Sequence, residues 1–145
     1  MAQKKQFEFL EDIATADAAY IAYGSSLPEL LSNAAAGLFA TMVDLDLVPP
    51  QVEREIEVEA DDREELLYNW LAELIYAKDV HAELYSSFEP KLHGDSPIHL
   101  TATVRGIAVD KLSGSTSCDV KAVTYHRFAI EDVATGLRAT VVLDL

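Results

Sequence analysis

Two segments of this chain repeat their apolar residues with the period of an α-helix, and most of the remaining chain alternates as β-strands do. The first helix is predicted to begin at the capping box Ser26-Leu27-Pro28-Glu29, which has a proline in its first turn. The second is predicted to begin at Asp61 or Asp62. The apolar stripes that identify the helices are Leu30, Leu31, Ala34, Ala35, Leu38 and Phe39, then Leu66, Leu67, Trp70, Leu71, Leu74 and Ile75. Both stripes must be buried against another layer of the fold.

The predicted strands surround these helices. They cover residues 7–10, 18–23, 52–60, 82–88, 98–109, 120–130 and 137–145. The strand at 52–60 alternates most strictly and places four glutamates on one, solvated face, namely Glu53, Glu55, Glu57 and Glu59. This order of elements predicts a single α+β domain over residues 1–145, in which a largely antiparallel β-sheet carries two α-helices packed on one face.

The charge of the chain limits its partners. Asp and Glu number 25 against 11 Lys and Arg, which gives a formal net charge of −14. Binding to phosphate backbones depends on Lys and Arg, and an excess of negative charge repels RNA, DNA and anionic membranes at long range. We therefore expect no direct nucleic-acid binding and no membrane partner. The partners that this charge favours are cations and basic protein surfaces.

The motifs of the common enzyme classes do not occur in the sequence. There is no glycine-rich phosphate loop, no serine nucleophile elbow and no paired-histidine metal motif. The single cysteine, Cys118, excludes an intrachain disulfide and a cysteine zinc cluster, and we interpret it as a packing residue. No apolar stretch has the length of a signal peptide core or a membrane span, so we expect a cytoplasmic protein.

Asp17 and Asp144 are carboxylates in apolar surroundings, one near each end of the chain. Asp17 begins a predicted strand, and Asp144 ends a strongly apolar one just before Leu145, whose main-chain carboxylate is a further candidate. A charge in such a setting is costly unless a cation or hydrogen-bond donors compensate it, and clustered oxygens bind hard cations such as Ca²⁺ and Mg²⁺. Alternatively, Asp144 points to solvent from an exposed edge. The residues alone leave both interpretations open.

Lys121 and His126 lie in another candidate segment, on opposite faces of the strand predicted at 120–130. Lys121 is suited to pair with a carboxylate or to reach a partner, and His126 is suited to donate to a carboxylate that holds a metal. The alternatives are an edge lysine that discourages aggregation and a structural histidine.

Four short strings of this sequence resemble the archease family and occur in the same order as they do there. They are Thr15-Ala16-Asp17, the helical string Glu65-Leu66-Leu67-Tyr68-Asn69-Trp70-Leu71, the string Lys-Ala-Val-Thr-Tyr-His at residues 121–126, and Leu143-Asp144-Leu145. The third string is the most specific. The resemblance extends from Phe7 to the last residue.

The resemblance implies an accessory protein and not an enzyme in its own right. Archeases promote formation of the covalent guanylate intermediate of the RtcB-class tRNA-splicing ligase, allow it multiple turnovers and can broaden its nucleotide use. They carry a divalent metal site, seen with calcium, with Mg²⁺ and Mn²⁺ as other possible ions. Carried over to this chain, the metal ligands are Asp17, Asp144 and Leu145, and Lys121 matches a functionally important lysine.

This chain also departs from the family pattern. Ala14 stands where a histidine is usual before Thr-Ala-Asp, Ala19 stands in place of a common glycine, and Asn69 stands in place of a common aspartate. The loss of the histidine removes any proton-transfer role at that position. Two other functions stay open: a divergent metal-dependent phosphoester hydrolase with His126 as its base, and a chaperone-like module that binds basic clients on the face formed by Glu53 to Glu59.

Overall fold

The computed structural model describes residues 6–10 and 17–145, and its order of elements is the predicted one. The helices are α1 (Leu27–Met42) and α2 (Arg63–His81). The strands are β1 (Phe7–Leu10), β2 (Asp17–Gly24), β3 (Val52–Ala60), β4 (Glu83–His93), β5 (Ile98–Ala108), β6 (Ala122–Val133) and β7 (Gly136–Asp144). Two short 3-10 turns, Leu45–Leu47 and Val109–Lys111, lie in the connections. Within the described residues, neither helix has the length and apolarity required to cross a membrane.

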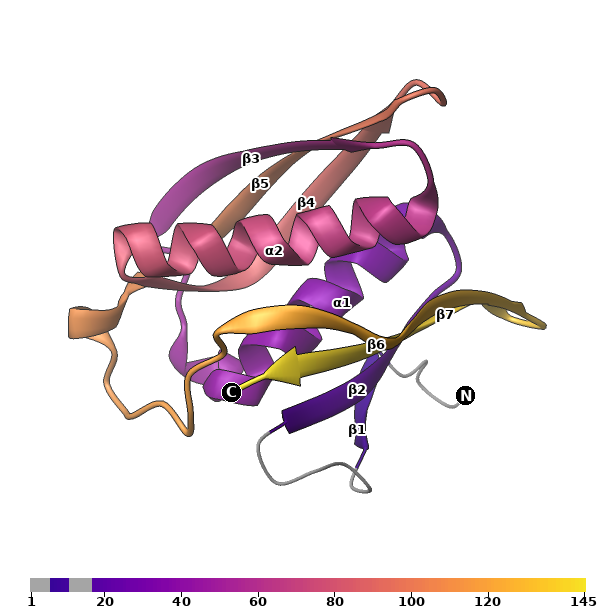
Figure 1. The fold of residues 1–145 in the computed structure, drawn as a ribbon. Helices are drawn as coiled ribbons and strands as arrows, with labels where there is room; N and C mark the ends of the chain where they lie inside the picture. Colours follow the sequence, from indigo (N-terminus) through magenta and orange to yellow (C-terminus); the bar gives the residue numbers. More distant parts are fainter. Residues whose placement is uncertain (1–5, 11–16) are drawn as a thin grey trace.

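The helices lie between two antiparallel sheets. The strand orders are β1-β2-β7-β6 and β3-β5-β4. In Figure 1 the three-stranded sheet covers one side of the helix pair and the four-stranded sheet covers the other. The α+β class and the antiparallel pairing are confirmed. The strands form two sheets where the sequence was interpreted as one, because α1 buries residues on more than one side and so has a sheet on each.

Both helices begin at the predicted caps. The Ser26 hydroxyl accepts a hydrogen bond from the Glu29 backbone N–H at 3.4 Å, and the Asp62 carboxylate accepts one from the Glu65 N–H at 2.8 Å. These side chains satisfy backbone donors that have no partner within the helix. A cap of this kind is a local feature, which is why the sequence alone predicts it.

Two aromatic residues hold the layers together in the core. Trp70 of α2 is fully buried, and its indole N–H donates to the Leu31 carbonyl of α1 at 2.9 Å. Tyr20 of β2 is also fully buried, and its hydroxyl donates to the Ala34 carbonyl at 2.7 Å. The Tyr20 ring lies against Gly37, where a Cβ atom would come within 2.5 Å of the ring. This close approach sets the position of β2, the strand that begins at Asp17.

Glu83 is a buried charge with a specific set of partners. Its side chain is 5% exposed and accepts two hydrogen bonds from the Arg54 guanidinium, at 2.9 and 3.1 Å, and one from the Tyr85 hydroxyl at 2.8 Å. The hydrogen bonds from Arg54 are the main cause that lowers the pKa of Glu83, and they outweigh the opposing effect of burial. The pair joins β3 to β4, which are the two edges of the three-stranded sheet.

We expect the stability difference between the wild type and Glu83→Gln to depend on pH. The pKa of Glu83 is lower in the folded state than its ordinary value of 4.5. Its ionised form therefore contributes stability that is fully present above about pH 4.5 and is lost as the pH falls through the folded pKa. Urea unfolding of both proteins between pH 7 and pH 3 measures this. A difference that stays constant over that range would contradict the assignment.

Candidate functional site

The structure places Asp17 and Asp144 directly opposite each other, although they come from the two ends of the chain. They form the first pair in the antiparallel register of β2 and β7. Side chains of directly opposed residues lie on the same face of the sheet, with Cβ atoms about 4.5–5.5 Å apart. In Figure 1 the beginning of β2 and the end of β7 lie at the same end of the four-stranded sheet. The two carboxylates that the sequence analysis selected are thus neighbours.

The apolar residues of β7 determine this register. Ala139, Val141 and Leu143 alternate along the strand and are all buried in the core. A slip of one residue would turn them outward, so the pairing of β7 with β2 is strongly specified. The alternation also requires Asp144 to point to the other face, away from the helices, where it is exposed, and its partner Asp17 is half-buried.

Two like charges directly opposite each other on a sheet destabilise it unless something compensates them. Lys121 is the nearest basic residue in the register, because its backbone N–H donates to the Asp144 carbonyl at 2.8 Å and the next residue, Ala122, pairs with Asp144. The Lys121 side chain is exposed, and among the described residues no ion pair joins it to either aspartate. The aspartate pair therefore has the charge and the oxygen donors that suit a hard cation.

The described residues supply two side-chain carboxylates to such a cation, which is fewer ligands than a complete coordination shell needs. In residues 6–10 and 17–145 no group of three or more His, Cys, Asp or Glu side chains is placed to hold a metal ion. Leu145 follows Asp144 directly, and its half-buried side chain packs against the core. Ala14, one of the positions at which the sequence analysis found a departure from the archease pattern, lies outside the described residues.

His126 lies apart from the aspartate pair. It is exposed, and its backbone N–H donates to the Thr124 hydroxyl at 3.3 Å. Three residues lie between it and Ala122, the partner of Asp144, and the register of β6 with β7 is interrupted after Thr124. Among the described residues, His126, Asp17 and Asp144 form no group that is placed to hold a metal ion.

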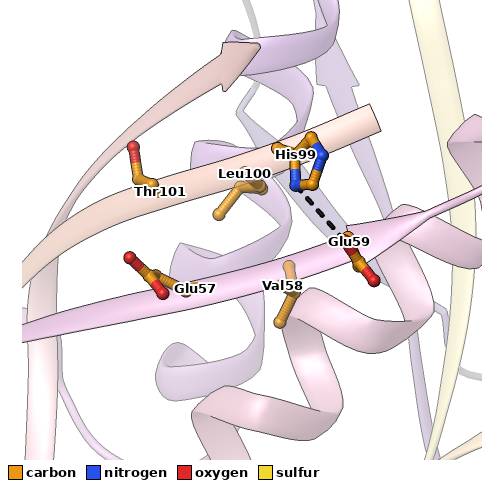
Figure 2. Close-up of a pocket in the computed structure, with 6 residues that line it drawn as sticks. All are labelled: Glu57, Val58, Glu59, His99, Leu100 and Thr101. Atoms are coloured by element: carbon orange, nitrogen blue, oxygen red, sulfur yellow. Dashed lines mark ion pairs between the residues drawn. The ribbon is translucent and has the colours of Figure 1, made fainter. Parts of the chain in front are cut away.

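The glutamate face of β3 is exposed, as the alternation predicts, and it contains a shallow hollow of about 320 Å³. Figure 2 shows its lining, with Glu57 and Thr101 side by side and the His99 ring turned toward Glu59 at 3.3 Å. Further along the same face, Arg105 pairs with both Glu53 and Glu89. Neighbouring strands thus supply partners for several of these charges, which is typical of a solvated sheet face.

Cys118 is half-buried, and its thiol lies 3.3 Å from the Thr41 carbonyl. Burial is the main cause that raises the pKa of this thiol, and Asp119 adds to it. A thiol with a raised pKa is a poor nucleophile. The interpretation of Cys118 as a packing residue therefore agrees with its surroundings.

The sequence analysis did not single out Tyr125 as a binding residue. The structure shows it in a part of β6 that has no register partner on β7, between Thr124 and Ala129, with 69% of its surface exposed. A possible signal was the run of polar residues that interrupts the alternation after Tyr125, namely His126 and Arg127.

Comparisons with known proteins agree on one family. The family model described as "Archease protein family (MTH1598/TM1083)" matches residues 7–145. The chain is 41% identical over 142 residues to the protein archease of Methanothermobacter thermautotrophicus, with 97% of this chain and 99% of that protein covered. It is 32% identical over 145 residues to the protein archease of Methanosarcina mazei, with 99% and 98% covered.

Two solved structures have the same fold. A solution structure of a protein from Methanobacterium thermoautotrophicum superimposes with a TM-score of 0.85 at 40% identity and covers 97% of this chain and 99% of that one. A crystal structure from Thermotoga maritima, described as an archease and possible chaperone, superimposes with a TM-score of 0.63 at 22% identity, with 100% and 98% covered. The second likeness concerns the fold alone.

Proposed function

Because the chain belongs to the archease family, we propose that it activates an RtcB-class RNA ligase through a divalent cation held by Asp17 and Asp144. The observation that carries the proposal is the pairing of these two residues across β2 and β7. Two like charges directly opposite each other on a sheet are stabilised by a positive charge between them, and the carboxylates offer the oxygen donors that Ca²⁺, Mg²⁺ and Mn²⁺ prefer.

The ligand set that we propose consists of Asp17, Asp144 and Leu145, with water or oxygens of the partner completing the coordination. A bound divalent ion supplies positive charge that can orient phosphate oxygens. The chain's own part is to hold the two carboxylates in one register and to expose Asp144 at the surface, where a partner's active site can reach it. Calcium is the ion that the family resemblance favours.

Lys121 supports this role by its position. Its backbone N–H donates to the Asp144 carbonyl, and the residue is exposed. A flexible lysine in this place is suited to contact a phosphate or a carboxylate of the ligase. The net charge of −14 keeps the activator from competing with the ligase for RNA, because like charges repel at long range.

The alternatives lack a supporting observation in the described residues. A hydrolase that used the aspartates as ligands and His126 as base would need these groups within hydrogen-bond reach of one reacting water, and among the described residues His126 forms no group with Asp17 and Asp144 that is placed to hold a metal ion. A chaperone-like site on the glutamate face would need free carboxylates, and several of these are paired with neighbouring side chains.

The test is to add the purified chain to the RtcB-class ligase of the same host and to count ligation events per ligase molecule. We expect the chain to increase the number of turnovers of the ligase and to speed the formation of the guanylated ligase. Chelation of divalent ions bound to the chain should reduce the effect. The chain incubated alone with a phosphoester is the control for the hydrolase alternative. Unchanged turnover at saturating chain would refute the proposal.

A further inference from the structure

Two stacked tyrosines, of which Tyr125 is exposed and Tyr68 is half-buried, form an aromatic surface beside the N-terminus of α2. The rings of Tyr125 and Tyr68 are parallel to within 3°, with centroids 4.0 Å apart, and Phe128 meets both rings edge-on. The Tyr68 hydroxyl donates to the Val123 carbonyl at 3.2 Å, which holds the stack on β6. We call Tyr68, Tyr125 and Phe128 the aromatic platform. Tyr68 covers one face of the Tyr125 ring, and Tyr125 is still 69% exposed.

The platform forms one wall of a hollow of about 410 Å³ whose other walls are acidic. The lining residues are Asp62, Glu64, Glu65, Asn69, Tyr125 and Phe128. The three carboxylates come from the beginning of α2, and the two aromatic rings come from the part of β6 that leaves the ladder with β7. The hollow thus has both aromatic rings and carboxylates in its lining.

The basic side chain nearest in the sequence, Arg63, forms its ion pair outside this set of carboxylates, although it also interacts with the charge of Glu64. Arg63 directs both its terminal nitrogens to Asp132, at 3.1 and 3.2 Å. In the part of the chain that the structure describes, neither Asp62 nor Glu65 forms an ion pair. Arg127, which lies in the unpaired part of β6, is not among the residues that line the hollow. The carboxylates accept backbone hydrogen bonds, Asp62 from Glu65 and Glu64 from Ile130, which orient them without cancelling their charge.

We propose that this hollow receives an arginine side chain from a basic segment of a protein partner. A guanidinium stacks on the face of an aromatic ring and at the same time donates hydrogen bonds in its plane to carboxylates. Lysine carries a compact, strongly hydrated charge and gains less from a flat ring. A nucleic-acid base would also stack on Tyr125, but its phosphates would lie next to three carboxylates and be repelled.

The hollow is separate from the aspartate pair, so its occupant can be tested without the ligase. Whether the arginine belongs to the ligase rests on the proposed function. If it does, the platform contributes affinity and the aspartate pair contributes activation. Substitutions at the two places should then have different kinetic effects.

The direct test is a titration of the isotopically labelled chain with a tetra-arginine peptide, followed by NMR. We expect chemical shift changes centred on residues 62–69 and 124–130, and weaker binding of a tetra-lysine peptide. Tyr125→Ala and Glu65→Gln should each weaken tetra-arginine binding about five- to tenfold, whereas Tyr125→Phe, which keeps the ring, should bind almost as the wild type does.

Tyr76→Ala is the matched control, because Tyr76 is a tyrosine of the same helix that is 61% exposed and lies outside the platform. It should leave the binding unchanged. Shift changes spread over the glutamate face of β3 and unaltered by Tyr125→Ala would overturn the proposal. Changes caused by tetra-uridylate and not by tetra-arginine would overturn it as well, in favour of RNA.

In the ligase assay, Tyr125→Ala should raise the concentration of chain needed for half-maximal stimulation about five- to tenfold and leave the maximum unchanged. An unchanged half-maximal concentration would show that the arginine bound in the hollow does not belong to the ligase. If the wild-type chain gives no stimulation at all, the proposed function fails, and the peptide titration still decides whether the hollow binds arginine.

Discussion

Asp144→Ala is expected to reduce the stimulated ligase to the turnover of the ligase alone, without unfolding the chain. Asp144 is one of two opposed carboxylates in the proposed metal site, and its removal leaves Asp17 as a single side-chain ligand there. Substituting a residue that only orients a metal ligand usually costs 10–100-fold in affinity, so the loss of a ligand should weaken Ca²⁺ binding by about 100-fold or more. Calorimetric titration with Ca²⁺ and the turnover count measure the two effects independently.

The stability of this variant is a useful internal check. Asp144 is exposed and faces a like charge, so its removal should leave the thermal midpoint unchanged or slightly raised in the absence of metal. Asp110→Ala is the matched control, because Asp110 is an exposed aspartate in the turn Val109–Lys111. It should retain both Ca²⁺ binding and stimulation. Full stimulation by Asp144→Ala would show that the aspartate pair is not the activating site.

Gly106→Ala is expected to destabilise the fold by about 3 kcal/mol, because the added methyl group has no room beside β4. A Cβ atom on Gly106 would lie 1.8 Å from the Leu84 carbonyl oxygen and 2.7 Å from the Tyr85 Cα. Both contacts are with the backbone of β4, so no side-chain rotation can relieve them. Tyr85 is also the register partner of Gly106, at the point where the pairing of β4 and β5 shifts. Urea unfolding measures the loss.

Gly114→Ala is the control for this substitution. The one close neighbour of a Cβ at Gly114 is the Leu47 Cδ1 atom at 2.8 Å, the far end of a side chain that can rotate away. We expect a change within about 0.5 kcal/mol, as for most surface substitutions. If Gly106→Ala is as stable as Gly114→Ala, then β4 and β5 can separate locally more easily than their geometry suggests.

The elements themselves were largely predictable, because their causes are local. The caps at Ser26 and Asp62 and the apolar stripes behind them identify both helices within a few residues. The strict alternation of residues 52–60 predicts β3 with its exposed glutamates. The strand predicted at 82–88 extends to His93 in the structure, because strand ends depend on pairing with a neighbour and not on local pattern alone.

The pairing of strands was not predictable in the same way. Alternation shows that a segment is a strand, but it does not show which other strand lies beside it. The sequence was therefore interpreted as one sheet, whereas β3, β5 and β4 form a sheet of their own on the far side of the helices. The pair of Arg54 and the buried Glu83 was also missed, since its members come from strands that are separated by α2 in the chain.

For the candidate site, the sequence was enough to select the residues: Asp17 and Asp144 stand out as charges among apolar neighbours, and the resemblance to archeases selects the same two. That they face each other could not be read from the sequence, because the register of β2 with β7 depends on how Val141 and Leu143 are buried. The aromatic platform likewise exists only in three dimensions, where Tyr125 leaves its ladder and stacks on Tyr68 of α2. Helices and strands depend on residues that are close in the sequence. A site depends on strand pairing and core packing, which bring distant residues together at the surface.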